Sequence, residues 1–211
     1  MAELKIGRMV MGPVGTNCYF VYNENKEAIV FDPPTGGKEL FERLTSNGLT
    51  IEAILLTHGH FDHIMGVNEL RKCAGVKVYA CEEEQEVCES SEMNCSDQIG
   101  RPYVTQADVY VRDEEEIQIK DMKCRLLHTP GHTKGSCCYY FYEDGLLISG
   151  DTLFAGSVGR TDLPTGSMGT LERSISQKLS KLPDDTKVYP GHGDQTTIEF
   201  ERKHNPFWKT E

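Results

Sequence analysis

The feature that most constrains this chain is the segment 58–63, which reads His-Gly-His-Phe-Asp-His and directly follows an apolar run. That run, residues 51–56, has the length and composition of a buried strand. Thr57 and Gly59 end this run and give the backbone more freedom to turn. A segment with helical apolar periodicity then starts at about Phe61. Three histidines and one aspartate are therefore expected on a strand-to-helix turn, where side chains can converge on one point.

The spacing within this segment indicates a metal site. His58 and His60 lie two residues apart in extended backbone, so their side chains point the same way and can reach one ion. Asp62 and His63 lie one turn further on and are placed to serve a second ion. Imidazole and carboxylate ligands suit zinc, iron and manganese. The chain has seven histidines and three lie here, which favours a metal site over exposed loop histidines beside an N-cap aspartate.

Three later turns repeat one design, in which an apolar strand ends in a glycine-rich turn that carries one candidate ligand. These ligands are His132, Asp151 and His192. The glycines allow close backbone approach, and strand ends place the side chains along one edge of a sheet. The donors divide into one set for each of two ions and one bridge: His58, His60 and His132; Asp62, His63 and His192; and Asp151 between them. Two ions roughly 3.5–4 Å apart with a water between them form the arrangement used for two-metal hydrolysis.

Three other polar residues are not among the predicted metal ligands. Asp32 follows an apolar run and fits either a turn residue or a carboxylate that supports a metal ligand. His128 precedes Pro130 in an apolar strand and is interpreted as structural or as a support for the ligands. His204 is expected to be solvated.

Composition limits the partners. The length of 211 residues fits one domain, 1–211, and the formal net charge of −11 argues against nucleic acid or an anionic membrane as the main partner. A small-molecule substrate is compatible with this charge, because a bound dication dominates its local field. Residues 1–8 contain no apolar signal core, and the eight cysteines form no Cys-x-x-Cys pair. Reduced thiols and a cytoplasmic location are therefore expected, with the protein as a monomer or homodimer.

Apolar periodicity and turn residues predict an α/β fold with strand–helix–strand alternation. Strands are expected at 4–11, 16–23, 27–32, 51–56, 76–80, 109–111, 115–119, 123–129, 136–142, 145–149 and 187–189. Helices are expected at 38–47, 62–73, 82–95 and 169–181. The segment 82–108 is interpreted either as a lid or substrate wall or as a solvated helix and loop.

The motifs His-x-His-x-Asp-His, Thr-Pro-Gly-His-Thr, Ser-Gly-Asp-Thr-Leu-Phe and Pro-Gly-His-Gly together resemble the metallo-β-lactamase superfamily, from about Gly15 to His192. Within it the pattern is most similar to short bacterial proteins like type II glyoxalase (hydroxyacylglutathione hydrolase). The resemblance implies a four-layer αββα sandwich with a dinuclear site at one edge of the two sheets. It implies two divalent ions, first zinc and otherwise iron or manganese. β-Lactamases of this fold typically carry cysteine where Asp151 stands, which argues against antibiotic hydrolysis.

The resemblance also implies an activity. Thioester hydrolysis by a metal-bridging hydroxide is the leading hypothesis, with Asp62 orienting the nucleophile and Asp151 bridging the ions. The loop 154–162 resembles that of glyoxalase II-like proteins and persulfide dioxygenases; Arg160 is expected to pair with Asp162 and is a candidate substrate contact.

Three other functions remain open at this point. One is a persulfide dioxygenase with a single iron held by His58, His132 and Asp151. The others are a lactonase of the same superfamily and a non-catalytic, metal-stabilised binding module. Full-length type II glyoxalases carry a helical C-terminal domain that binds glutathione, and no such separate domain is expected here. The acyl group and the thiol carrier therefore stay open.

Overall fold

The computed structural model describes residues 4–208, so residues 1–3 and 209–211 of the predicted domain lie outside the described part. Two six-stranded sheets face each other. The first sheet contains, in order, β1 (Lys5–Met11), β2 (Thr16–Tyr22), β3 (Glu27–Phe31), β4 (Thr50–Leu55), β5 (Lys77–Cys81) and β6 (Val109–Val111). The second contains β14 (Thr196–Thr197), β13 (Lys187–Pro190), β10 (Leu146–Gly150), β9 (Cys137–Phe141), β8 (Met122–His128) and β7 (Glu116–Ile119).

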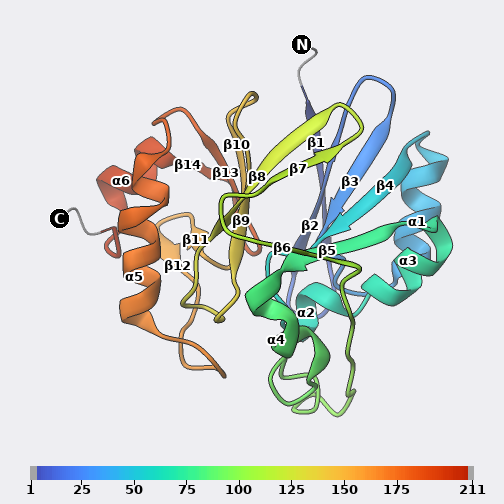
Figure 1. Ribbon diagram of the computed structural model, residues 1–211, viewed down its shortest axis with the longest axis horizontal. Coiled ribbons are helices and arrows are strands. Elements are labelled where there is room, and N and C mark those ends of the chain that lie inside the picture. The colour runs from blue at the N-terminus through green and yellow to red at the C-terminus, as the bar shows by residue number, and fades with distance from the viewer. Residues whose placement is uncertain (1–3, 209–211) are drawn as a thin grey trace.

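Helices cover the outer face of each sheet (Figure 1). On the first sheet these are α1 (Gly37–Ser46) and α3 (Val67–Ala74), and on the second they are α5 (Met168–Gln177) and α6 (Ile198–His204). The shorter elements are α2 (Phe61–Ile64), η1 (Glu82–Glu84), α4 (Gln85–Glu89), η2 (Leu179–Lys181) and the hairpin of β11 (Leu153–Phe154) with β12 (Ser157–Val158).

The apolar residues form three layers of core. Between the sheets, Phe31 packs against Tyr139 and Phe141 with ring centroids 5.6 and 6.1 Å apart. Leu40 on α1 and Leu70 on α3 belong to the core outside the first sheet. Buried apolar residues of α5 belong to the core outside the second sheet. Each sheet therefore has apolar side chains on both faces, and both faces must be covered by another layer. The predicted four-layer αββα sandwich is confirmed.

The carboxyl ends of the central strands meet at one edge of the sandwich. Strand β4 pairs in parallel with β3 and β5, and β10 pairs in parallel with β13. Backbone hydrogen bonds join the two sheets at this edge: the Cys137 N–H donates to the Thr57 carbonyl at 2.9 Å, and the Asn17 N–H donates to the Gly191 carbonyl at 2.8 Å. The Tyr139 hydroxyl donates to the Leu56 carbonyl at 2.8 Å. The Gly191 N–H also donates to the Gly150 carbonyl at 2.8 Å, so these bonds hold the turns after β4, β10 and β13 at one edge.

The predicted strands are present with ends shifted by no more than one residue, but the helices differ in four places. The helix expected at 62–73 divides into α2 and α3, because Gly66 packs against the Pro33 carbonyl and donates its N–H to it at 2.9 Å. The helix expected at 169–181 ends at Gln177 and continues as the 3-10 turn η2. Helix α6 was not predicted, although Thr197 caps it by accepting the Phe200 N–H.

The helix expected at 82–95 is wrong beyond Glu89, where the chain turns instead. The Asn94 side chain accepts the Ser96 N–H at 2.9 Å and donates to the Tyr103 carbonyl at 2.8 Å. Side-chain bonds to local backbone of this kind compete with helical bonds. Among residues 4–208, no helix is long and apolar enough to cross a membrane.

Replacing Gly131 by alanine is expected to cost about 3 kcal/mol or more in unfolding free energy. Gly131 has φ 137°, and an added Cβ would lie 2.4 Å from the Leu171 backbone nitrogen. Gly75 also has a positive φ, 69°, but its Cβ would meet open space, so Gly75→Ala is the matched control, expected to cost about 1 kcal/mol. Urea unfolding of both variants measures the difference, and equal costs would contradict the packing described for Gly131.

Candidate metal centre

Five histidines and two aspartates converge at the edge where the strand ends meet. His58 and His60 lie in the turn after β4, and Asp62 and His63 lie on α2. His132 lies between β8 and β9, Asp151 follows β10 and His192 follows β13. Within residues 4–208, ligand atoms lie within 4.8 Å of one another in three groups: His58, His60 and His132; Asp62, His63 and His192; Asp32, His58 and His63.

The first group consists of three buried imidazoles. His60 Nδ1 lies 2.8 Å from His132 Nε2, which lies 3.2 Å from His58 Nε2. Burial is the largest cause that lowers the pKa of all three, and His60 reaches about 3. These imidazoles are therefore neutral at physiological pH, and neutral imidazole offers the lone pair that a metal ion needs. We refer to this group below as the histidine site.

The second group mixes charge. His192 Nε2 lies 3.2 Å from Asp62 Oδ2 and 3.3 Å from His63 Nε2. Burial lowers the pKa of His63, but Asp62 and Asp151 outweigh it and raise the pKa to about 10. Without metal this group is held by His⁺–carboxylate pairs, so metal binding must displace a proton. We refer to Asp62, His63 and His192 below as the mixed site.

Asp151 touches both sites. Its Oδ2 lies 3.5 Å from His132 Nε2 and 3.5 Å from His192 Nε2, and its Oδ1 lies 3.5 Å from His63 Nε2. Within the described residues, the buried Oδ1 has no hydrogen-bond partner. A buried carboxylate oxygen without a donor, surrounded by imidazole nitrogens, fits a cation rather than a vacant space. The donor set of nitrogen and carboxylate oxygen fits divalent metal ions.

Oxygen atoms around the histidines fix which ring nitrogen is free. His132 Nδ1 donates to the Arg160 carbonyl at 2.7 Å, and His63 Nδ1 donates to Asp32 Oδ2 at 3.1 Å. His58 Nδ1 lies 3.2 Å from the Thr57 hydroxyl, which itself donates to Asp32. In His58 and His132 the Nε2 atom keeps its lone pair and faces the cluster. In His63 the Nε2 atom faces Asp62 and Asp151, and its proton must leave before it can bind a metal ion. Supports of this kind orient metal ligands and raise their basicity.

Asp32, His128 and His204 are the three polar residues outside the predicted ligand set. Asp32 is buried, and besides the Thr57 hydroxyl and His63 it accepts the Thr57 N–H at 2.8 Å, so it stands behind the ligands. His128 is half-buried, and its Nε2 donates to the Lys134 carbonyl at 2.9 Å. His204 is exposed on α6.

Two supporting residues were not found from the sequence. The Thr16 hydroxyl donates to Asp62 Oδ2 at 2.9 Å, although Thr16 lies on β2, far from the His-rich segment in sequence. Glu84 is buried and accepts the Gly59 N–H at 2.7 Å. It belongs to the acidic run 82–86, and no feature of that run distinguishes it from its exposed neighbours.

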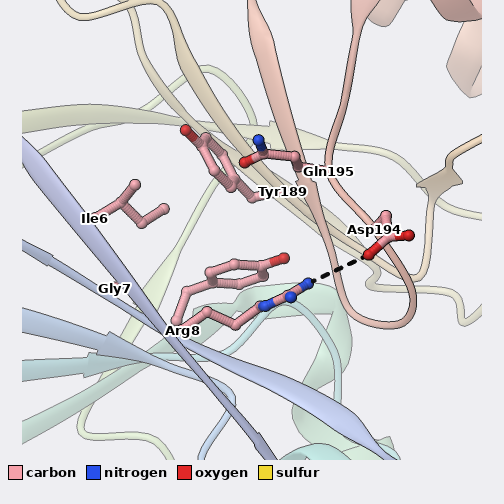
Figure 2. Close-up of a pocket in the computed structure, with 7 residues that line it drawn as sticks. Ile6, Gly7, Arg8, Tyr189, Asp194 and Gln195 are labelled. Carbon is pink, nitrogen blue, oxygen red and sulfur yellow. Dashed lines mark ion pairs between the residues drawn. The ribbon is translucent and has the colours of Figure 1, made fainter.

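The turn that carries His192 is braced from the first sheet. Arg8 on β1 donates to the Gly193 carbonyl at 3.1 Å and pairs with Asp194 at 3.9 Å (Figure 2). The Asn17 amide donates to the Pro190 and Gly193 carbonyls at 2.8 and 2.9 Å. A cavity of about 430 Å³ lies beside this brace. The edge strand β1 and its neighbour β2 therefore determine where the His192 backbone lies.

A cleft of about 530 Å³ opens onto both sites. Five of the ligand candidates line it: His60, Asp62, His132, Asp151 and His192. Its other walls are mostly apolar, formed by Val14, Phe61, Phe154, Val158 and Leu163. Arg160 also lines the cleft, and its guanidinium forms two bonds of 2.7 and 2.8 Å to the Asp162 carboxylate, the pair expected from the sequence.

Comparisons with known proteins agree with this architecture. Residues 11–192 match the family model of the metallo-beta-lactamase superfamily. A probable metallo-hydrolase from Bacillus subtilis is 39% identical over 206 residues, covering 97% of each chain. A hydroxyacylglutathione hydrolase from Haemophilus influenzae is 34% identical over 194 residues, covering 90% of this chain and 92% of its own.

Solved structures agree as well. The BLEG-1 B3 metallo-beta-lactamase superposes with a TM-score of 0.92 at 40% identity, over 97% of this chain and 99% of its own. The protein TTHA1623, solved in a di-iron-bound form, superposes with a TM-score of 0.82 at 34% identity, over 95% of this chain and 99% of its own. The family match and the His/Asp cluster lead to one conclusion: the chain belongs to the metallo-beta-lactamase superfamily, as one of its metal-dependent hydrolases.

Proposed function

We propose that this protein is a dinuclear metal-dependent thioesterase similar to type II glyoxalase. The observation that carries the proposal is Asp151, whose carboxylate lies 3.5 Å from nitrogens of both the histidine site and the mixed site. One carboxylate between two complete ligand groups is the arrangement of two-metal hydrolases. The relative named as a hydroxyacylglutathione hydrolase supports the choice of a thioester.

The residues divide the chemistry between them. His58, His60 and His132 would hold one ion, Asp62, His63 and His192 the other, and Asp151 would bridge them. Two bound divalent ions supply a water of lowered pKa and a Lewis acid for the acyl carbonyl. Asp62 accepts the Thr16 hydroxyl and lies beside His192, so its remaining lone pairs can orient the attacking water.

The leaving group explains the composition of the cleft. A thiolate departs without protonation, so hydrolysis of a thioester needs no general acid at the sulfur. Besides the ligand candidates, the described walls of the cleft carry mostly apolar side chains together with Cys95, Ser157 and Arg160, and no carboxylate beyond Asp62 and Asp151. The apolar walls also exclude water from the reacting carbonyl, which strengthens electrostatic stabilisation there.

A thioester panel tests this proposal. Protein loaded with zinc, iron or manganese is assayed with S-lactoylglutathione, acyl-coenzyme A esters and simple alkyl thioesters, with metal-stripped protein as the control. The proposal requires metal-dependent turnover of at least one thioester. No turnover of any of them by protein that contains two ions would overturn it.

Replacing Arg160 by glutamine is expected to raise KM about 5–10-fold for a thioester with a carboxylate group, with kcat nearly unchanged. Arg160 places a guanidinium in the wall of the cleft. We expect its contact with a carboxylate of the substrate, away from the reacting carbonyl, to be equally strong in the ground state and the transition state. Asp162→Asn is the matched control, because it breaks the same ion pair but keeps the guanidinium. An equal rise in KM for both variants, or for a neutral thioester, would show that only the loop conformation matters.

Hydrolysis of β-lactams is the second candidate function. The 40% identity to a structure described as a B3 metallo-beta-lactamase favours it, against the expectation drawn from Asp151. Both reactions attack an acyl carbonyl, and a β-lactam nitrogen needs a proton on departure whereas a thiolate does not. Assay of the same preparation with nitrocefin and with thioesters decides between the two by kcat/KM. A γ-lactone in the panel tests the lactonase alternative.

A further inference from the structure

We propose that Glu84 is a positioning residue that sets the spacing between the two turns of the histidine site. Its Oε1 accepts the Gly59 N–H at 2.7 Å, between His58 and His60. Its Oε2 accepts the Thr133 hydroxyl and the Gly135 N–H, each at 2.8 Å, in the turn that carries His132. One carboxylate therefore joins a turn of the first sheet to a turn of the second.

The packing around Glu84 leaves little freedom for either turn. A Cβ on Gly59 would lie 2.9 Å from the Cys88 nitrogen and sulfur, and a Cβ on Gly135 would lie 2.2 Å from the Glu84 nitrogen. Helix α4 and the 3-10 turn η1 thus contact both turns directly, and glycine at each position permits this approach. The segment 82–89 therefore packs against both turns of the histidine site, and Cys95 of the longer segment 82–108 lines the cleft.

The chemistry of the three contacts requires an acceptor at both oxygens. Gly59, Thr133 and Gly135 all donate, and Glu84 is 1% exposed, so an ionised carboxylate satisfies every partner. A glutamine would turn its NH₂ group toward one set of donors and leave buried polar groups unpaired. Burial raises the pKa of Glu84 to about 7, and the same three donors oppose that rise.

The consequence for metal binding is selective. The imidazole nitrogens of the histidine site lie 2.8–3.2 Å apart across the two turns, so a relative shift of the turns changes the shape of that site directly. The mixed site is held otherwise: Thr16 contacts Asp62, Asp32 contacts His63, and the β1–β2 brace holds the His192 turn. Loss of the Glu84 carboxylate should therefore weaken the histidine site and spare the mixed site.

The test is the affinity of each site for Co²⁺ in Glu84→Gln, measured by chelator competition from the fully loaded protein and followed by the visible spectrum of the bound ion. The histidine site is expected to bind Co²⁺ about 10–100-fold more weakly, with a changed spectrum. The mixed site is expected to keep its affinity. The matched control is Glu86→Gln, because the exposed Glu86 pairs with Lys134 of the same turn and should leave both affinities unchanged.

Two results would overturn the proposal. Equal weakening of both sites would mean that Glu84 only stabilises the fold, and unchanged affinities in a folded variant would mean that the contact does not position the ligands. If Glu84→Gln does not fold, Thr133→Val removes one of the three bonds and should give a smaller loss at the same single site. No loss at either site in that variant would contradict the proposal in the same way.

Discussion

Replacing Asp151 by alanine is expected to leave each chain with fewer than two bound ions and to lower kcat on the order of a thousandfold, about 4 kcal/mol. The Asp151 carboxylate lies 3.5 Å from nitrogens of both sites, and its buried Oδ1 has no other partner among the described residues. Its removal takes one negative charge from both ions at once. It also removes one of the carboxylates that lie beside His63 and His192 and attract their imidazolium groups.

Metal content per chain and thioesterase kinetics are measured together on this variant. Asp184→Ala is the control, because Asp184 is an exposed carboxylate that pairs with Arg202 far from the strand ends. Full activity with two bound ions in Asp151→Ala would be incompatible with a bridging role for this residue.

Asp32→Asn is expected to weaken the mixed site about 10–100-fold and to cost about 2–3 kcal/mol in the unfolding free energy of the metal-free protein. The Asp32 carboxylate accepts the Thr57 N–H and hydroxyl and the His63 Nδ1–H. An amide replaces one acceptor oxygen by a donor, so either the Thr57 N–H at Oδ1 or both the Thr57 hydroxyl and His63 Nδ1 at Oδ2 lose their acceptor. The His63 Nδ1 contact is the longest of the three, at 3.1 Å.

Thermal or urea unfolding of metal-free protein separates the stability cost from the metal effect. Asp62 is a useful comparison, since Asp62→Asn removes a candidate ligand without touching Thr57. If Asp32→Asn lost stability but kept the affinity of the mixed site, Asp32 would support the turn at Thr57 and not the ligand His63.

The ligand candidates could be predicted from the sequence because the residues that mark each of them lie close to it in the chain. Each lies in a turn that follows an apolar strand, and a strand end can be recognised from a few residues. The structure brings all seven together at the edge of the sandwich that the family resemblance implied. The predicted fold class is confirmed. It could also be predicted from local signals, because regular strand and helix periods extend through both halves of the chain.

The residues that support these candidates depend on contacts between distant segments. Thr16 reaches Asp62 across 46 positions and Glu84 reaches Thr133 across 49, and no local pattern encodes such partners. The helix expected at 82–95 failed for a related reason. In the second half of this segment, the side chains of Asn94 and Ser96 form hydrogen bonds with the backbone in place of helical bonds. Their bonds to the Tyr103 carbonyl form only once the following segment has folded back. The break at Gly66 likewise needs the Pro33 carbonyl from a neighbouring turn.

Elemental mass spectrometry of the protein, expressed without added metal, tests the central claim most directly, because it gives both the identity of the metal and the number of ions per chain. The two ligand groups joined by Asp151 predict two ions per chain, of zinc, iron or manganese. One iron per chain, with no second ion taken up on addition of metal, would contradict the dinuclear hydrolase. That result would favour a persulfide dioxygenase centred on His58, His132 and Asp151, with oxygen uptake as its assay.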